Sequence, residues 1–236
     1  LTFEEPAART YIIKELCKYY LTDGDLPHPD YINALGDLWA AQNFNIRYLI
    51  DTFFKSRLFF HPAFRGNLVK SPYHFYLGLC QDLQLDVMPF TGRTLQSLRI
   101  MGQNFYNPPN VRGWLYGQHW INSSTISARR QLVDYLFNPV NEKQLNGNDK
   151  RSLQAARDDG QANFQVDFVR LNPLMKLDGE AIAEHLSKFF ITAPSRPTYQ
   201  TAISKLLDGY KQKQKPYHEI RQVVIGLLQS PAYNLC

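Results

Sequence analysis

The sequence has little cysteine, and its three thiols lie far apart. Cys17, Cys80 and Cys236 form no C-x-x-C pair, no haem-attachment C-x-x-C-H motif and no spacing typical of a zinc site. This pattern excludes a metal site built from cysteines. It also argues against a disulfide framework, because at most one pair could bridge.

Long apolar runs and a strong charge imbalance are also missing. No uninterrupted apolar stretch reaches the ~18 residues that a membrane-spanning helix requires, and the mean hydropathy is −0.37. The 26 Lys and Arg residues against 21 Asp and Glu leave a net charge of +5, spread along the chain. Such a mild excess permits a polyanionic partner without indicating one. We therefore expect no membrane span in this chain.

What remains is an ordinary globular composition. The 236 residues are 44% hydrophobic and 20% charged, which suits one large domain or two small ones. The chain starts at Leu1, and no basic and then apolar leader follows. We expect a processed chain or a fragment of a longer protein.

Helical periodicity dominates the first half of the chain. Apolar residues recur at three-to-four spacing after Pro6 until Asp23 and Gly24 end the pattern. Further helices are expected at about 30–42, 46–55 with Asn45 as N-cap, 72–83 with Ser71 as N-cap and Pro72 in the first turn, 94–101, and 125–137 with Ser123 or Ser124 as N-cap. Alternation typical of a strand is brief and confined to 164–168. The sequence thus predicts an all-α fold, a multi-helix orthogonal bundle.

Composition also predicts the domain organisation. Polar and charged residues with glycine replace aromatic and branched aliphatic residues over 138–163, which indicates an exposed, loosely attached linker that a protease should cut first. We expect a helical unit at 1–137, a polar linker at 138–170 and a second helical unit at 171–236, packed together as one body.

The two ends of the chain resemble each other. Residues 43–59 align without gaps to 217–233 and keep Ile46/Ile220, Arg47/Arg221 and Ser56/Ser230, while 16–22 matches 186–192. A duplicated three-helix unit explains both matches. We therefore expect residues 7–59 to superpose on residues 179–233.

The most unusual segment is the Pro- and Trp-rich stretch 102–124. Pro108 and Pro109 prevent a helix there, and Trp114 and Trp120 are two of the three tryptophans of the chain. Flat aromatic faces beside hydrogen-bonding side chains suit a sugar or a peptide. The alternative is a rigid plug whose polar groups bond to nearby backbone. Our candidate binding residues are Asn110, Arg112, Trp114, His119, Trp120, Asn122 and Arg129, and we expect Arg112, Trp114, Trp120 and Arg129 to act as one unit.

A family resemblance rests on this stretch. The run Phe105-Tyr-Asn-Pro-Pro-Asn-Val-Arg-Gly-Trp114, continuing through Trp120-Ile-Asn-Ser-Ser-Thr125 to Arg129, resembles the signature of the bacterial family known as domain of unknown function eighteen hundred. Lys70-Ser-Pro72 and Leu227-Leu-Gln-Ser-Pro-Ala-Tyr233 resemble two further motifs of that family. The resemblance implies that the chain corresponds to the C-terminal half of a typical member. His74 and Gln81 stand where the family pattern has Glu and Arg.

The resemblance implies a location and a partner but no established activity. It implies an exported, extracytoplasmic protein whose gene neighbours encode a second family similar to alkaline phosphatases and sulfatases. A partner of that kind, or the N-terminal half of a longer protein, is therefore expected.

Enzyme templates are absent from the sequence. There is no H-E-x-x-H, G-x-S-x-G, Walker or dinucleotide motif. The six histidines are scattered along the chain: His28, His61, His74, His119, His185 and His218. We therefore expect no metal site and no cofactor. Basic and aromatic residues interleave over 205–221, but without RNP-type or helix-turn-helix cues we do not expect a nucleic-acid partner.

Two functional hypotheses follow. The first is an extracytoplasmic helical scaffold or binding module that engages a protein partner or a surface glycan through the 103–129 loop. The second is an accessory or hydrolase-like enzyme of polysaccharide metabolism whose catalytic groups lie partly outside this chain.

Overall fold

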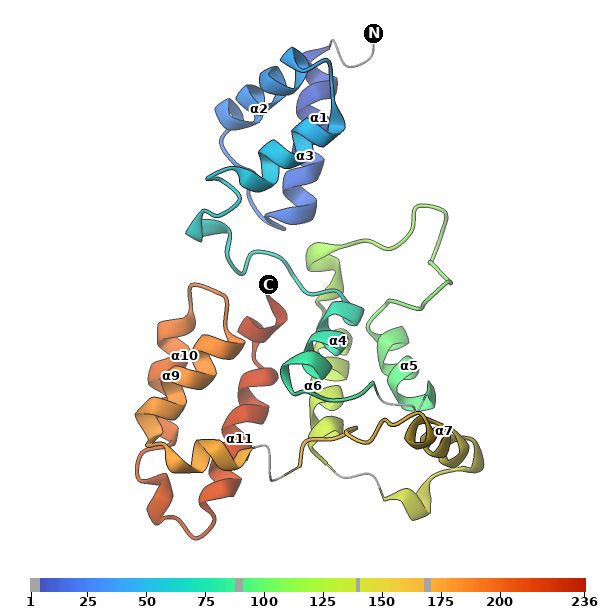
Figure 1. Cartoon of the computed structure of the whole chain (residues 1–236), viewed down its shortest axis with the longest axis vertical. Coiled ribbons are helices and arrows are strands. Elements are labelled where there is room, and N and C mark those ends of the chain that lie inside the picture. The colour runs from blue at the N-terminus through green and yellow to red at the C-terminus, as the bar shows by residue number, and fades with distance from the viewer. Residues whose placement is uncertain (1–4, 88–90, 139–140, 168–170) are drawn as a thin grey trace. The chain divides into compact units, whose positions relative to one another are not determined.

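The computed structural model describes residues 5–87, 91–138, 141–167 and 171–236 (Figure 1). Within these ranges all regular secondary structure is helical, and the only strand-like pairing is an isolated antiparallel bridge between Val69 and Leu235. The predicted all-α fold is confirmed. The chain divides into two compact units, Leu1–Leu68 with Cys236 (unit 1) and Val69–Leu235 (unit 2).

Unit 1 is a three-helix unit. Its helices are α1 (Pro6–Tyr20), α2 (Pro29–Ala41) and α3 (Ile46–Lys55), followed by the short 3-10 helix η1 (Pro62–Phe64). Asn45 caps α3 as predicted, because its Oδ1 accepts the Tyr48 N–H at 3.1 Å. Trp39 anchors the core and donates its indole N–H to the Asn45 carbonyl at 3.1 Å. One apolar stripe from each helix therefore closes a single small core.

Unit 2 holds the other described helices. Its α-helices are α4 (Pro72–Asp82), α5 (Thr91–Ile100), α6 (Ser123–Phe137), α7 (Gly147–Asp158), α9 (Gly179–Phe190), α10 (Arg196–Leu206) and α11 (Pro216–Leu228). Short 3-10 helices lie between them, with the last one after α11: η2 (Gly117–Trp120), η3 (Glu142–Gln144), η4 (Asn172–Lys176), η5 (Tyr210–Gln212) and η6 (Pro231–Asn234). Ser71 caps α4 as predicted, since its Oγ accepts the His74 N–H at 3.2 Å.

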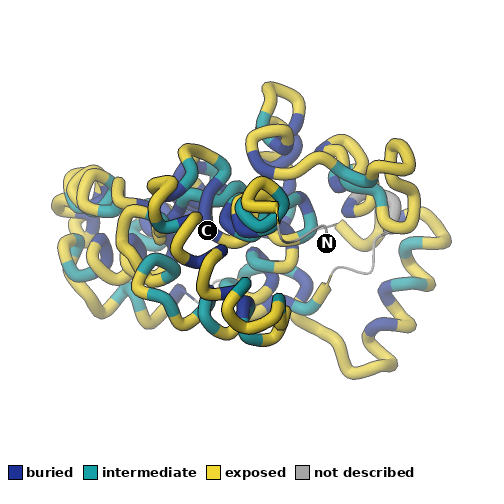
Figure 2. The backbone as a smooth tube through the Cα atoms, turned by 90° about the horizontal axis from the view of Figure 1, so that it is seen from above, coloured by how far each residue is buried: buried dark blue, intermediate teal, exposed yellow. Residues whose placement is uncertain are grey.

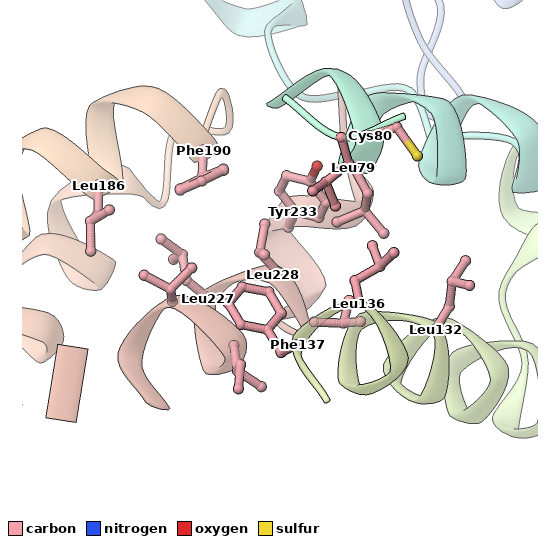
Figure 3. Packing of buried hydrophobic residues seen from close by; sticks show 14 of the residues in the cluster. Leu79, Cys80, Leu132, Leu136, Phe137, Leu186, Phe190, Leu227, Leu228 and Tyr233 are labelled. Atoms are coloured by element: carbon pink, nitrogen blue, oxygen red, sulfur yellow. The ribbon is translucent and has the colours of Figure 1, made fainter. Parts of the chain in front are cut away.

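The core of unit 2 is shared by helices far apart in sequence. Figure 3 shows side chains of α4, α6, α9 and α11 converging around Tyr233, which follows α11. In Figure 2, buried and exposed residues alternate along the helices, as expected when each helix buries one face. This common core fixes the elements that carry the candidate site.

The N-cap of α6 differs from the one predicted. Asn122, rather than Ser123 or Ser124, precedes the helix, and its Oδ1 accepts the Thr125 N–H at 3.0 Å. Thr125 Oγ1 in turn accepts the Asn122 N–H at 2.8 Å. This reciprocal capping box satisfies the backbone N–H groups of Asn122 and Thr125 together. Ser123 or Ser124 as the N-cap would not form this pair of bonds with Thr125.

The polar stretch after residue 138 also differs from the predicted linker. Residues 147–158 form helix α7, whose Leu153 and Ala156 lie buried in the core of unit 2 together with Leu145 and Phe164. The compact units divide after Leu68, not across 138–170. A few spaced apolar anchors bury one helix face despite the polar average. That a protease cuts first within this tract stays a prediction.

The two segments that resemble each other have the same element order. Residues 7–59 contain α1, α2 and α3, and residues 179–233 contain α9, α10 and α11. The paired serines also make the same turn: Ser56 Oγ accepts the Phe59 N–H at 3.2 Å, and Ser230 Oγ accepts the Tyr233 N–H at 3.4 Å. That the segments superpose as duplicated units stays a prediction.

Equivalent roles for the two serines predict equivalent losses. Ser56→Ala and Ser230→Ala should each lower the free energy of unfolding of their own unit by about 1 kcal/mol or more, because each removes the hydrogen bond that the serine Oγ accepts. Ser56→Ala also removes the bond that its Oγ donates to the Phe53 carbonyl at 2.7 Å. Hydrogen exchange measured peptide by peptide assigns each loss to its unit. Ser127→Ala, an exposed change on α6, is the control. A loss at only one of the two paired sites would contradict their equivalence.

Candidate functional site

Arg129 is the charged group at the centre of unit 2. It lies on the buried face of α6 with Thr125, Leu132 and Leu136, and only 2% of its surface is exposed. Its Nη2 donates to the Lys70 carbonyl at 2.7 Å, and its Nη1 donates to Asn234 Oδ1 at 3.2 Å. The guanidinium also lies 4.9 Å from the centre of the Phe75 ring.

Both acceptors of this guanidinium are neutral amide oxygens. Burial lowers the pKa of Arg129 to about 10, so the group is still charged at neutral pH. A buried cation held by neutral dipoles depends on each of those dipoles being in place. The geometry therefore ties the position of α6 to the residues that supply the two acceptors.

Those acceptors come from the two ends of unit 2. The Lys70 N–H donates to the Asn234 carbonyl at 2.8 Å, next to the Val69–Leu235 bridge. The Asn234 side chain donates its Nδ2 to the Ser230 carbonyl at 2.9 Å. Arg129 thus closes a three-way junction between segments 59 and 105 residues away from it in sequence.

Tyr233 extends this junction into the core. Its hydroxyl donates to Asp82 Oδ2 at 2.8 Å, and Lys70 Nζ lies 3.7 Å from the centre of its ring. Burial, and then the charge of Asp82, raise the pKa of Tyr233 well above its usual range. Partial burial and the charge of Lys70 lower the pKa of His74, one turn into α4. We call Lys70, Asp82, Arg129, Tyr233 and Asn234 the arginine junction.

The loop between α5 and α6 is attached at its base beside this junction. Gln103 Oε1 accepts the Tyr73 N–H at 3.1 Å, and the Phe105 ring packs edge-on against Tyr73 with centroids 4.3 Å apart. Trp120 is 7% exposed, and a Cβ placed on Gly102 would lie 3.6 Å from its indole. Gly102 also has a φ of +93°, which favours glycine there. The base of the loop is therefore packed.

The outer part of the loop is not packed in this way. In Figure 1 it runs out from the helices of unit 2 between α5 and α6. Its large apolar side chains are exposed, with Tyr106 at 94% and Val111 fully open to solvent. We call the exposed set the loop tip: Tyr106, Val111, Arg112, Leu115 and Tyr116.

The seven predicted site residues fall into two groups. Trp120, Asn122 and Arg129 have structural contacts, as a packed indole, a helix cap and the junction cation. Asn110, Arg112 and His119 are exposed, and Trp114 is half-buried. Asn110 shapes the tip, since its Oδ1 accepts the Arg112 N–H at 2.9 Å. That Arg112, Trp114, Trp120 and Arg129 act as one unit stays a prediction.

Sequence reasoning missed four members of the arginine junction as site residues. Lys70 and Tyr233 lie in the Lys-Ser-Pro and Ser-Pro-Ala-Tyr motifs, which marked them by resemblance but showed no contact between them. Asp82 and Asn234 carried no local signal. The structure brings these motifs together with Arg129.

Two further findings concern metals and membranes. Among the described residues, no group of three or more His, Cys, Asp or Glu side chains is placed to hold a metal ion. No helix in the described part of the chain is long and apolar enough to cross a bilayer.

The fold and the site define an all-α protein with a buried arginine junction and a projecting aromatic loop. The chain matches the family described as "Protein of unknown function (DUF1800)" over residues 1–235, and it belongs to that family. Neither the curated proteins nor the solved structures contain a match. That the chain corresponds to the C-terminal half of a typical member stays a prediction.

Proposed function

We propose that this chain is an extracytoplasmic binding module that engages a protein partner through the loop tip. The carrying observation is the contrast between a packed loop base and an exposed apolar tip on the same loop. Exposed apolar clusters of this kind mark interaction surfaces, and Tyr with Arg is the composition typical of binding hot spots. A fixed base limits the ordering cost of association.

The family resemblance supplies the chemical class of the partner. A protein similar to alkaline phosphatases and sulfatases, encoded beside genes of this family, is the first partner to test. A surface glycan is the other ligand that aromatic faces suit. An accessory role in polysaccharide metabolism would fit a glycan result better than a protein result.

Surface plasmon resonance with both ligand types tests the proposal. The intact chain should bind the neighbour-encoded protein, and Tyr106→Ser/Val111→Ser should weaken binding about tenfold or more, because each change removes an exposed apolar contact. The free energy of unfolding of this variant should lie within about 0.5 kcal/mol of the parent, since both side chains are almost fully exposed.

A matched double change on unit 1 is the control. Tyr11 and Leu38 are also exposed apolar residues, and Tyr11→Ser/Leu38→Ser should leave the affinity unchanged. Equal weakening by both variants would argue against the loop tip as the binding surface. Binding to cell-surface polysaccharide without binding to the protein would replace the protein partner with a glycan.

A further inference from the structure

A cavity of about 700 Å³ lies in unit 2, where the end of α6 meets the start of α11. Its lining combines buried and half-buried side chains with three exposed polar ones, Asp167, Lys215 and His218. The lining residues are Phe137, Gln165, Val166, Asp167, Lys215, Tyr217, His218 and Arg221. Its volume is within the range of small-molecule sites, roughly 300–1,000 Å³.

Hydrogen bonds to the end of α6 fix two walls of this cavity. The Val166 N–H donates to the Leu136 carbonyl at 2.9 Å, and Gln165 Nε2 donates to the Asn138 carbonyl at 2.6 Å. From the opposite side, Arg221 Nη2 donates to the Phe137 carbonyl and to Asn138 Oδ1, each at 3.0 Å. The guanidinium is therefore held in place by one of its nitrogens.

The cavity lining has more basic than acidic side chains. The lining contains the basic side chains of Lys215 and Arg221, and Asp167 is the single carboxylate among its described residues. Charges of both signs act on the pKa of Tyr217. Burial raises this pKa, the charge of Arg221 lowers it, and the charge of Asp167 raises it. The described lining thus carries net positive charge beside the half-buried side chains of Val166 and Tyr217.

The basic and aromatic residues that interleave over 205–221 have different surroundings in the structure. Lys213 pairs with Glu219 at 2.8 Å, and Lys211 lies 5.9 Å from the Tyr210 ring centre. Lys215, Tyr217 and Arg221 instead face one cavity. These three residues line a cavity only in the folded protein, because the segment 165–167 and the end of α6 supply its other walls.

We propose that this cavity binds a small organic carboxylate with an apolar or aromatic body. Arg221 and Lys215 would hold the carboxylate, and the half-buried side chains of Val166 and Tyr217 would cover the body. This site is separate from the loop tip and does not depend on the function proposed for it.

Titration of the intact chain with benzoate, phenylacetate, indole-3-acetate and hexanoate tests this proposal. At least one acid should bind at millimolar concentration or below, and should shift the backbone amide NMR signals of Val166, Tyr217 and Arg221. Phenylacetamide, which lacks the charge, and D-glucuronate, which lacks the apolar body, should bind about tenfold more weakly or not at all.

Charge reversal at the rim gives the matched variants. Lys215→Glu should weaken binding of the best acid about tenfold, whereas Lys211→Glu, which lines a different cavity, should change it less than about twofold. Both lysines are exposed, so neither change should unfold the protein. The absence of shifts with all four acids, equal binding of the amide, or equal weakening by both variants would overturn the proposal.

Discussion

Replacing Arg129 by alanine should lower the free energy of unfolding of unit 2 by about 3–5 kcal/mol. The change removes the donor of the partly buried Lys70 carbonyl and of the buried Asn234 Oδ1, at about 1–3 kcal/mol each, and it removes the packing of the side chain against Phe75. The measurement is urea unfolding followed by circular dichroism, with hydrogen exchange to assign the loss to unit 2.

The neighbouring arginine supplies the control for this experiment. Arg130 is exposed on the same helix, so Arg130→Ala should alter stability by no more than about 0.5 kcal/mol. Similar losses in the two variants would mean that helix propensity or net charge, rather than the arginine junction, stabilises unit 2. A near-native Arg129→Ala protein would move Arg129 back to the ligand-binding role considered from sequence.

The second large effect is expected at Trp120. Its indole is buried against Gly102, so Trp120→Ala should destabilise unit 2 by about 3–5 kcal/mol through loss of apolar burial and creation of a cavity. Trp114 is half-buried, and Trp114→Ala should lose about 1 kcal/mol or less. Thermal and urea unfolding of both variants provide the comparison.

These two tryptophans separate the two interpretations of the loop. A large loss at Trp120 with a small loss at Trp114 supports a packed base and an outer part open to a partner. Large losses at both positions would show that the whole loop is a plug. Small losses at both would contradict the burial of Trp120 and would favour a ligand-binding surface along the entire loop.

The helices of the first half were predictable because their signals are local. Asn45 and Ser71 each cap a helix with their own side chains, and Pro72 suits a first turn wherever it occurs. Three-to-four spacing of apolar residues depends only on helix geometry. Such features need no knowledge of what the helix packs against.

Two predictions made from local sequence failed, each for its own reason. For the cap of α6, several neighbouring residues could serve. For the polar linker, the average composition concealed the spacing of a few apolar residues. In Asn122-Ser-Ser-Thr125, each of the first three residues can cap a helix, and the reciprocal bonds with Thr125 select Asn122. Over 138–163 the polar average concealed Leu145, Leu153 and Ala156, which are buried in the core of unit 2. A few buried anchors are enough to order a polar helix when a core is already present.

The sequence by itself determined the helical class, most helix starts in the first half, the unusual loop and the family resemblance. Only the tertiary structure decided that Arg129 is buried, that Lys70 and Asn234 hold it, and that Lys215, Tyr217 and Arg221 face one cavity with residues 165–167. The physical reason is the sequence separation over which each kind of interaction acts. Caps and periodicity act within a few residues, whereas a buried cation is stabilised by acceptors 59 and 105 residues away, which no local pattern encodes.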